Sequence, residues 1–526
     1  MKTKSLKTQT LIRLGIFAGI LILLNFVSVR IFGRLDMTRN SLFTLSDASK
    51  ALVGSLDDRV TVKAFFTEDL PAPYNATRRT LLDQLNEYKA YAKGNLQFEF
   101  IDPADPKSEQ EAEQNGIAPV QVQVLKDDKF EVKRGYMGVV LQYEGRKEVI
   151  PVVQNTANLE YELSSAVKRL TNTVRRKVGF LTGHGEVPQN EITNLQETLR
   201  RQYDVTAVDV GRNAPVPADV AVLVVAAPNA RIPDDAKLQI DQFLMRGGRI
   251  AFLVNTIDAN LQERFGRPLE TGLEDLLESY GVKLNHDVVR DVQCANISIM
   301  QQQAGFAFRS QVAFPYIPVV SNFSPGNIIV KDLQGIVLFF ASSLDTIGVA
   351  AQGLSGEILF RSSKQSGRHE GMLVIDPLQQ YTPGDFPEGE IPLGVLVSGS
   401  FRSFFAGKPI PSDTAAGSAA PLASLQEKSL ESRILVVGDG DFVRDQFSGR
   451  DNATFFANCV DVLADDAGLV TIRSREASTP PLEPVSDSTR RWIKYANLAL
   501  PPLLVIGYGI ARWRMRKARK RALELQ

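Results

Sequence analysis

The 526-residue chain is poor in the two residue types that most often bind metals or form covalent intermediates, with two cysteines and three histidines. Cys294 and Cys459 lie far apart, and neither has a second Cys or His at metal-ligand spacing, so they predict neither a disulfide framework nor a zinc site. Burial as small apolar residues is the expected fate of both, although a disulfide between them stays open if they lie outside the cytoplasm.

The chain also lacks an excess of either charge, because 60 basic residues balance 60 acidic ones. No global electric field therefore draws it to nucleic acid, and nucleic acid is not an expected partner. The length is sufficient for two to four domains with cores of their own.

Several catalytic signatures are missing from the sequence. No G-x-x-x-x-G-K-[ST] loop occurs, so the chain has no phosphate-binding loop of its own and is not expected to be an ATPase. Neither G-x-S-x-G nor H-E-x-x-H occurs. We expect no cofactor, no resident metal and no catalytic residue.

Long apolar runs occur only at the two ends. The run "LIRLGIFAGILILLNFVSV" from Leu11 to Val29 predicts a transmembrane helix over 11–32. The run "YANLALPPLLVIGYGIA" from Tyr495 to Ala511, flanked by Trp492 and Trp513, predicts a second over 492–512. The basic tail 513–526 and the parity of two spans place both termini, 1–10 and 513–526, in the cytoplasm.

Each predicted span contains residues suited to helix packing in a membrane. Gly15 and Gly19 have the spacing that lets two helix backbones approach closely. Pro501 and Pro502 are tolerated where neighbouring helices satisfy the freed carbonyl groups. These four residues are the expected packing positions.

An α/β module is predicted over 36–150. Thr44 and Ser46 are candidate N-caps of a short helix, "RVTVKAFF" alternates as a strand, and "YMGVVLQYEGRKEVIPV" indicates a hairpin turned at Glu144 and Gly145. The order of strand, helix, strand and hairpin suggests a thioredoxin-like module without a Cys-x-x-Cys motif. A connecting helix is expected over 151–174.

A larger α/β domain is predicted over 175–475. The run "DVAVLVVAAP" is typical of strands buried on both faces, and its alternation with helical segments predicts a doubly wound parallel sheet. An insertion is expected over 293–400, a mobile loop over 406–429 and a linker over 476–491.

Two acidic loops follow predicted strands. In "VGFLTGHGE", His184 and Glu186 can form a catalytic pair, a loop that contacts a ligand or partner, or a structural turn. In "GDGDFV", Asp439 and Asp441 would repel a pyrophosphate, which leaves a divalent cation or a polar turn. We take these four residues as the candidate ligand or partner loops.

The sequence resembles the GldG-like family, the auxiliary subunits of gliding-motility-type ABC transport systems. The resemblance rests on the apolar N-terminus, the entry "RLDMTRNSLFTLSDASKALVGSLDDRVTVKAFF", the "KVGFLTGHGE" segment and the basic C-terminus. It implies a glutamine-amidotransferase-like α/β fold and, as partners, an ABC permease and a cytoplasmic ATPase at the bacterial inner membrane. Because neither Cys294 nor Cys459 is predicted on a nucleophile turn, amidotransferase activity is not implied.

The expected function is therefore a non-catalytic, membrane-anchored subunit of an ABC-type transport complex, whose periplasmic domains meet a substrate or envelope component. One alternative is an anchored cell-envelope hydrolase or metal-dependent enzyme that uses His184 and Glu186. A second is a structural anchor of an envelope assembly.

Overall fold

The computed structural model describes residues 44–524 together with Phe17 and Gly19. Within that range it omits 69, 71–73, 127–128, 154–155, 173–174, 212–213, 304–305, 332, 409–424, 448, 465–469, 471 and 473–486. The described chain is mixed α/β, as expected. It consists of two compact units, the first ending at Ser478 and the second beginning at Thr479.

The first part of the chain folds around a four-stranded sheet of order β2-β1-β5-β6. Strands β1 and β2 are parallel, whereas β5 is antiparallel to both β1 and β6. The strands are β1 (Val60–Phe66), β2 (Leu96–Ile101), β5 (Met137–Tyr143) and β6 (Arg146–Ile150). A parallel pair is thus extended by an antiparallel hairpin, and the thioredoxin-like assignment of this part stays a prediction.

Four helices and one further hairpin accompany this sheet. They are α2 (Asp47–Gly54), α3 (Tyr74–Tyr91), α4 (Pro106–Gln114), α5 (Leu159–Thr171) and the hairpin of β3 (Val120–Lys126) with β4 (Lys129–Gly135). The predicted turn between β5 and β6 is confirmed, since Glu144 and Gly145 both have the positive φ of a two-residue hairpin turn. Of the two candidate N-caps of α2, Ser46 is the one whose hydroxyl accepts a hydrogen bond from the N–H of Ser49.

Helix α5 packs in the same apolar core as the first sheet, through residues such as Leu163 and Val167. A buried polar contact also fixes its start: Glu160 Oε1 accepts hydrogen bonds from the Ser46 N–H and the Ser49 hydroxyl, both at 2.7 Å. The segment expected to be a connecting helix is thus also part of this core.

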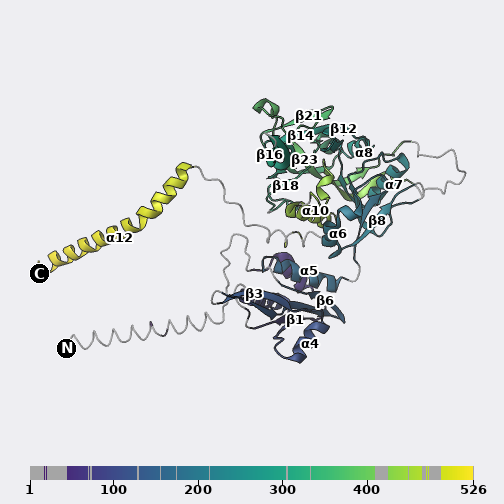
Figure 1. Ribbon diagram of the computed structural model, residues 1–526. Coiled ribbons are helices and arrows are strands. Elements are labelled where there is room, and N and C mark those ends of the chain that lie inside the picture. The colour runs from purple at the N-terminus through teal and green to yellow at the C-terminus, as the bar shows by residue number, and fades with distance from the viewer. Residues whose placement is uncertain are drawn as a thin grey trace. The chain divides into compact units, whose positions relative to one another are not determined.

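An eight-stranded sheet forms the larger α/β region, in the order β17-β20-β23-β24-β10-β9-β7-β8. Figure 1 labels two of its strands, β23 and β8. Five neighbouring strands are mutually parallel: β8 (Asp204–Asp209), β7 (Lys177–Thr182), β9 (Val220–Ala226), β10 (Arg249–Leu253) and β24 (Lys428–Val437). Three further strands extend one side of the sheet, each antiparallel to the strand next to it: β23 (Pro392–Arg402), β20 (Ser355–Arg361) and β17 (Asn322–Phe323).

Both faces of the parallel strands are covered by helices. Along β9, Val222 and Val224 belong to one apolar core and Leu223 and Val225 to the other, as the two-residue period of a strand requires. The first core contains residues of α6 (Thr193–Arg200) and α10 (Arg450–Leu463), and the second contains residues of α7 (Asp234–Met245) and α8 (Glu274–Ser279). The continuous apolar run in β9 thus reflects burial on both faces.

Part of region 293–400, which was expected to be an insertion of the same domain, belongs to the main sheet. Strands β17, β20 and β23 extend this sheet, because β23 pairs directly with β24 through eight registered residue pairs. Because β23 is antiparallel to β24, the sheet is mixed, whereas a doubly wound parallel sheet was expected. Non-local pairing of this kind leaves no signature in local hydropathy.

The remaining strands form small sheets, and most of them lie around a separate apolar cluster that includes Phe314, Tyr316 and Phe340. They are β11 (Ile257–Asn260), β12 (Phe265–Pro268) and β22 (Leu373–Val374); β13 (Lys283–Leu284) and β19 (Leu344–Asp345); β14 (Asp287–Asp291) and β21 (Ser366–Glu370); and β15 (Cys294–Gln303), β16 (Phe306–Val320) and β18 (Ile336–Val337). The pair of β13 and β19 instead contributes Leu284 and Leu344 to the second core of the main sheet. Between β19 and β20 lies the short helix α9 (Ile347–Ala351).

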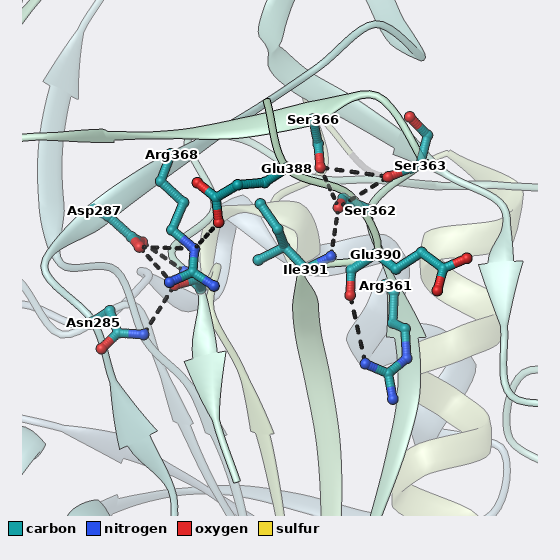
Figure 2. Close-up of polar contacts among 11 residues, drawn as sticks. Asn285, Asp287, Arg361, Ser362, Ser363, Ser366, Arg368, Glu388, Glu390 and Ile391 are labelled. Atoms are coloured by element: carbon teal, nitrogen blue, oxygen red, sulfur yellow. Dashed lines mark hydrogen bonds and ion pairs between the residues drawn. The ribbon is translucent and has the colours of Figure 1, made fainter. Parts of the chain in front are cut away.

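A buried polar cluster ties these small sheets to one another (Figure 2). Asp287, which is 2% exposed, accepts hydrogen bonds from the N–H and the hydroxyl of Ser343 at 2.8 and 2.6 Å. Arg368 on β21 lies 3.8 Å from the same carboxylate and 3.2 Å from Glu388. The carboxylate is therefore both hydrogen-bonded and charge-paired, as a buried charge requires.

The C-terminal unit contains the helix α12 (Asp487–Glu524), which continues through Pro501 and Pro502. Trp492 and Trp513 on this helix are largely exposed. The two-span prediction is corrected here, since no helix in the described part of the chain has both the length and the apolarity to cross a membrane. In α12 the apolar stretch lies between Lys494 and Arg512. Asn497 and the two prolines interrupt it.

Other sequence predictions fall outside the described residues. The first predicted span, 11–32, is described only at Phe17 and Gly19, both helical, and no neighbouring atom lies within 4 Å of a Cβ built on Gly19. Gly15 lies outside the described residues. So do residues 409–424 of the predicted mobile loop and most of the predicted linker 476–491.

Replacing Asp287 tests whether the cluster of Figure 2 stabilises the fold. We expect Asp287→Ala to lower the free energy of unfolding by about 2–4 kcal/mol, because the Ser343 groups would be left buried without an acceptor. Urea unfolding followed by circular dichroism measures this. Glu370→Ala is the control, since Glu370 is exposed and lies opposite Asp287 in the β14–β21 register. Equal losses in the two variants would contradict the assignment.

Candidate functional site

Four loops come together at the carboxyl ends of the parallel strands. Gly183 to Glu186 follow β7, Asn229 follows β9, Asn255 follows β10, and Asp439 to Asp441 follow β24. Because these strands are neighbours and run in one direction, their C-terminal loops share one edge of the sheet. This is where ligands bind in open α/β sheets.

The His184 loop is a tight turn held by its own carboxylate. Glu186 Oε2 accepts a hydrogen bond from the His184 N–H at 2.7 Å, and Glu186 Oε1 lies 3.1 Å from His184 Nδ1. Both residues are buried, at 8% exposure each. The sequence interpretation placed these residues in a common loop, and the structure shows that each is the other's partner.

Glycine is required at position 185 of this turn. Its φ of +73° is in the left-handed region, and a Cβ there would lie 1.7 Å from Asn229 Oδ1. The carbonyl of His184 also accepts hydrogen bonds from the N–H groups of Asn229 and Ala230, at 3.2 and 2.9 Å. The turn after β7 is thus packed directly on the loop after β9.

Asp439, the second residue after β24, is fully buried. Its carboxylate accepts hydrogen bonds from the N–H of Phe339 at 2.8 Å and of Asp441 at 2.7 Å. Burial and the neighbouring charge of Asp441 raise the pKa of Asp439 well above its usual value, although the backbone N–H groups act in the opposite direction. This side chain organises the loop, and its two oxygens are already engaged.

Asp441 is only partly buried and belongs to a charged cluster. It accepts hydrogen bonds from Arg444 Nε at 2.6 Å and from Asn255 Nδ2 at 2.7 Å. Arg444 also forms an ion pair with Glu191, at the start of the α6 region. Burial disfavours the guanidinium charge, but hydrogen bonds and attraction to the two carboxylates outweigh it and raise the pKa of Arg444.

A neighbouring carboxylate caps helix α6. Asp445 accepts hydrogen bonds from the N–H groups of Thr193 and Asn194, at 2.8 and 3.1 Å, and its own N–H donates to the carbonyl of Glu191 at 2.7 Å. The loop after β24 therefore fixes the start of the helix that follows β7, about 250 residues earlier in the chain.

A cavity of about 500 Å³ opens at this edge of the sheet. Its lining includes Asp441 but none of His184, Glu186 and Asp439. Sequence reasoning missed the other polar lining groups, among them Asn229, Asn255 and Arg444. The signal available for Asn229 and Asn255 was their position, because each follows a strongly apolar strand within three residues.

The arrangement offers binding groups more clearly than reactive ones. Among the described residues, no group of three or more His, Cys, Asp or Glu side chains could hold a metal ion. Both cysteines are free thiols, and burial raises the pKa of each, which disfavours the nucleophilic thiolate. Cys459 lies in the first apolar core, as its expected role as a small apolar residue requires.

Comparison with known proteins identifies relatives for most of the chain. A family model described as ABC-type uncharacterized transport system matches residues 175–464, more than half of the chain, and a model of a domain of unknown function matches 39–142. An uncharacterized protein of Borreliella burgdorferi is 25% identical over 514 residues, which span 94% of this chain and 95% of that protein.

Two solved structures are also similar. The mmIFT52 N-terminal domain aligns over 55% of this chain and 97% of its own, with 14% identity and a TM-score of 0.34. The structure of PurLQS from Thermotoga maritima aligns over 55% and 100%, with 10% identity and a TM-score of 0.24. At these TM-scores neither likeness supports a conclusion about this site.

Gly185→Ala tests the packing of the His184 turn against Asn229. We expect it to lower the free energy of unfolding by about 2–3 kcal/mol, since the left-handed conformation strains alanine and Asn229 must move away. The control is Gly353→Ala, whose φ of +72° is nearly the same but where no atom lies within 4 Å of the new Cβ.

The control should cost only the conformational strain, about 1 kcal/mol. Thermal and urea unfolding of the two variants measure the difference. If both substitutions cost the same, the contact between Gly185 and Asn229 does not restrict the site.

Proposed function

Because the chain belongs to the family of ABC-type uncharacterized transport system proteins, an ABC transport auxiliary family, we propose that it is a non-catalytic auxiliary subunit of an ABC-type transport complex. The family match over 175–464 supports this proposal most strongly, since it contains the whole eight-stranded sheet and the cavity at its carboxyl edge. A GldG-like role is the finer form of the proposal, supported by the sequence segments already quoted.

Division of labour gives the proposal its physical basis. ATP hydrolysis needs a glycine-rich loop whose N–H groups and lysine hold the phosphates, and the sequence contains no such loop. A separate cytoplasmic ATPase supplies hydrolysis and a separate permease supplies the pathway. This chain contributes a folded domain with a ligand-sized cavity.

The geometry at the sheet edge supports a binding role over a hydrolytic one. The Glu186 carboxylate contacts the N–H and the ring of His184, and the cavity lining includes neither residue. A general base must lie within hydrogen-bond reach of the group it deprotonates. Contact with substrate or with an envelope component through the Asp441 side of the edge is therefore the activity that we propose.

Affinity purification of the tagged full chain tests the complex. We expect two partners to copurify in stoichiometric amounts: an ATPase with a phosphate-binding loop and a multi-span permease. ATP hydrolysis should disappear when the partner's phosphate-loop lysine is replaced, and His184→Ala in this chain should leave it unchanged. Mass spectrometry and ATPase assays are the measurements.

An untagged strain is the control for nonspecific recovery. Recovery of envelope proteins without an ATPase, even after chemical crosslinking in cells, would favour a structural anchor and refute the transport proposal. Hydrolytic activity in the isolated chain that is lost in His184→Ala would favour the enzyme alternative.

We further propose that the folded region lies on the extracytoplasmic side of the bacterial inner membrane. Alkaline phosphatase inserted within 409–424 should then be active, because that reporter folds only where its disulfides can form. A cytoplasmic fluorescent reporter at the same position should be dark. The reverse pair of results would place the region in the cytoplasm.

A further inference from the structure

The cavity at the carboxyl edge has a lining that is rich in amides and aromatic rings. Five lining side chains are Asn or Gln: Asn229, Asn255, Asn260, Gln262 and Gln446. Three are phenylalanine: Phe339, Phe340 and Phe447. Amides can donate and accept hydrogen bonds at once, so this lining suits a ligand that carries both kinds of group.

The charges of the lining disfavour an anionic ligand. Asp258, Asp441 and Arg444 are the charged lining residues, and the guanidinium of Arg444 is held by Asp441 and by Glu191. The lining thus has two carboxylates and one cation, and that cation is already paired with Asp441 and with Glu191 outside the lining, so the edge has a negative balance. A phosphate or carboxylate ligand would meet repulsion there and no uncommitted arginine.

Some lining amides already form hydrogen bonds within the protein, and others can form hydrogen bonds to a ligand. Asn255 accepts a hydrogen bond from the Gly440 N–H at 2.7 Å and donates to Asp441, so both ends of its amide are used. Asn260 Oδ1 accepts hydrogen bonds from the N–H groups of Gln262 and Glu263. In contrast, the side chains of Gln262 and Gln446 are exposed and form no hydrogen bond with another described residue.

Apolar surface lies beside these amides. Phe339 and Phe447 stack with ring centroids 4.0 Å apart, which joins the segment before Phe340 to the loop after β24. Ile257, Leu261 and Leu269 from the β11–β12 region add further apolar surface to the lining. A ligand that fits must therefore present apolar C–H surface as well as hydrogen-bonding groups.

From this combination we propose that the cavity binds a neutral saccharide, one or two sugar rings in size. Ring hydroxyls and acetamido groups match the available amides of Gln262 and Gln446, and the C–H face of a sugar ring matches the apolar surface. A cationic ligand is less well matched, because Phe339 and Phe447 cover one ring face of each other and so form no open cage. This site does not depend on the proposed transport role.

Binding to the purified full chain tests the site directly. The probes are glucose, galactose, N-acetylglucosamine and its β-1,4-linked disaccharide, with inorganic phosphate, AMP and spermidine as charged comparators. Isothermal titration calorimetry and ligand-detected NMR measure affinity at concentrations up to 10 mM, roughly the weakest binding a single sugar ring is expected to show.

We expect at least one neutral saccharide to bind and the anions not to bind. Gln446→Ala and Gln262→Ala should each weaken saccharide binding roughly fivefold to tenfold, as expected when one hydrogen bond to the ligand is lost. Gln379→Ala is the matched control, since Gln379 is exposed and outside the cavity lining. Unchanged unfolding curves for the three variants establish that each is folded.

Three results would overturn the proposal: none of the four saccharides binds, a charged comparator binds more tightly than all of them, or the Gln379 variant weakens binding as much as the cavity variants. None of these results bears on copurification with an ATPase and a permease. The saccharide site and the transport role can therefore fail separately.

Discussion

Burial of the parallel strands on both faces is the constraint on which the rest of the structure depends. Because α6 and α10 cover one face of the sheet and α7 and α8 the other, neither face is open to a ligand. Polar groups that must meet a ligand are left at the strand ends, where loops from β7, β9, β10 and β24 meet. The cavity forms at this edge for that reason.

The edge is held in shape by interactions between residues far apart in sequence. Arg444 links the loop after β24 to Glu191, and Asp445 caps the helix that Glu191 precedes. Asp439 is buried beneath the same loop, with its carboxylate engaged by two backbone N–H groups. These groups are charged or buried for structural reasons, which separates them from Gln262 and Gln446, two exposed residues of the cavity lining. An acidic loop after a strand thus has two roles at once: it orders the edge and it sets the sign of the local charge.

Local sequence patterns predicted the elements well where burial alone decides them. The alternation in β1, the apolar run of β9 and the turn at Glu144 and Gly145 each depend on a few neighbouring residues. Hydropathy was misleading for the C-terminal segment, where an apolar stretch flanked by tryptophans suggested a membrane span. In the structure this stretch is part of a longer helix with prolines and charges close by, and no helix of the described chain is long and apolar enough to span a membrane. The addition of β20 and β23 to the main sheet was equally invisible, because strand pairing depends on partners distant in the chain.

The sequence by itself determined that the segments of β7 and β9 would be buried strands and that glycines flank His184 in a tight turn after the first of them. It also determined that the chain carries no phosphate-binding loop, since that motif is local and contiguous. Only the tertiary structure decided that His184 and Glu186 pair with each other, that Asp441 and not Asp439 lines the cavity, and that Asn229 and Asn255 stand beside it. The physical reason is that a binding edge is made by folding distant loops together, and no single stretch of sequence records which loops will be neighbours.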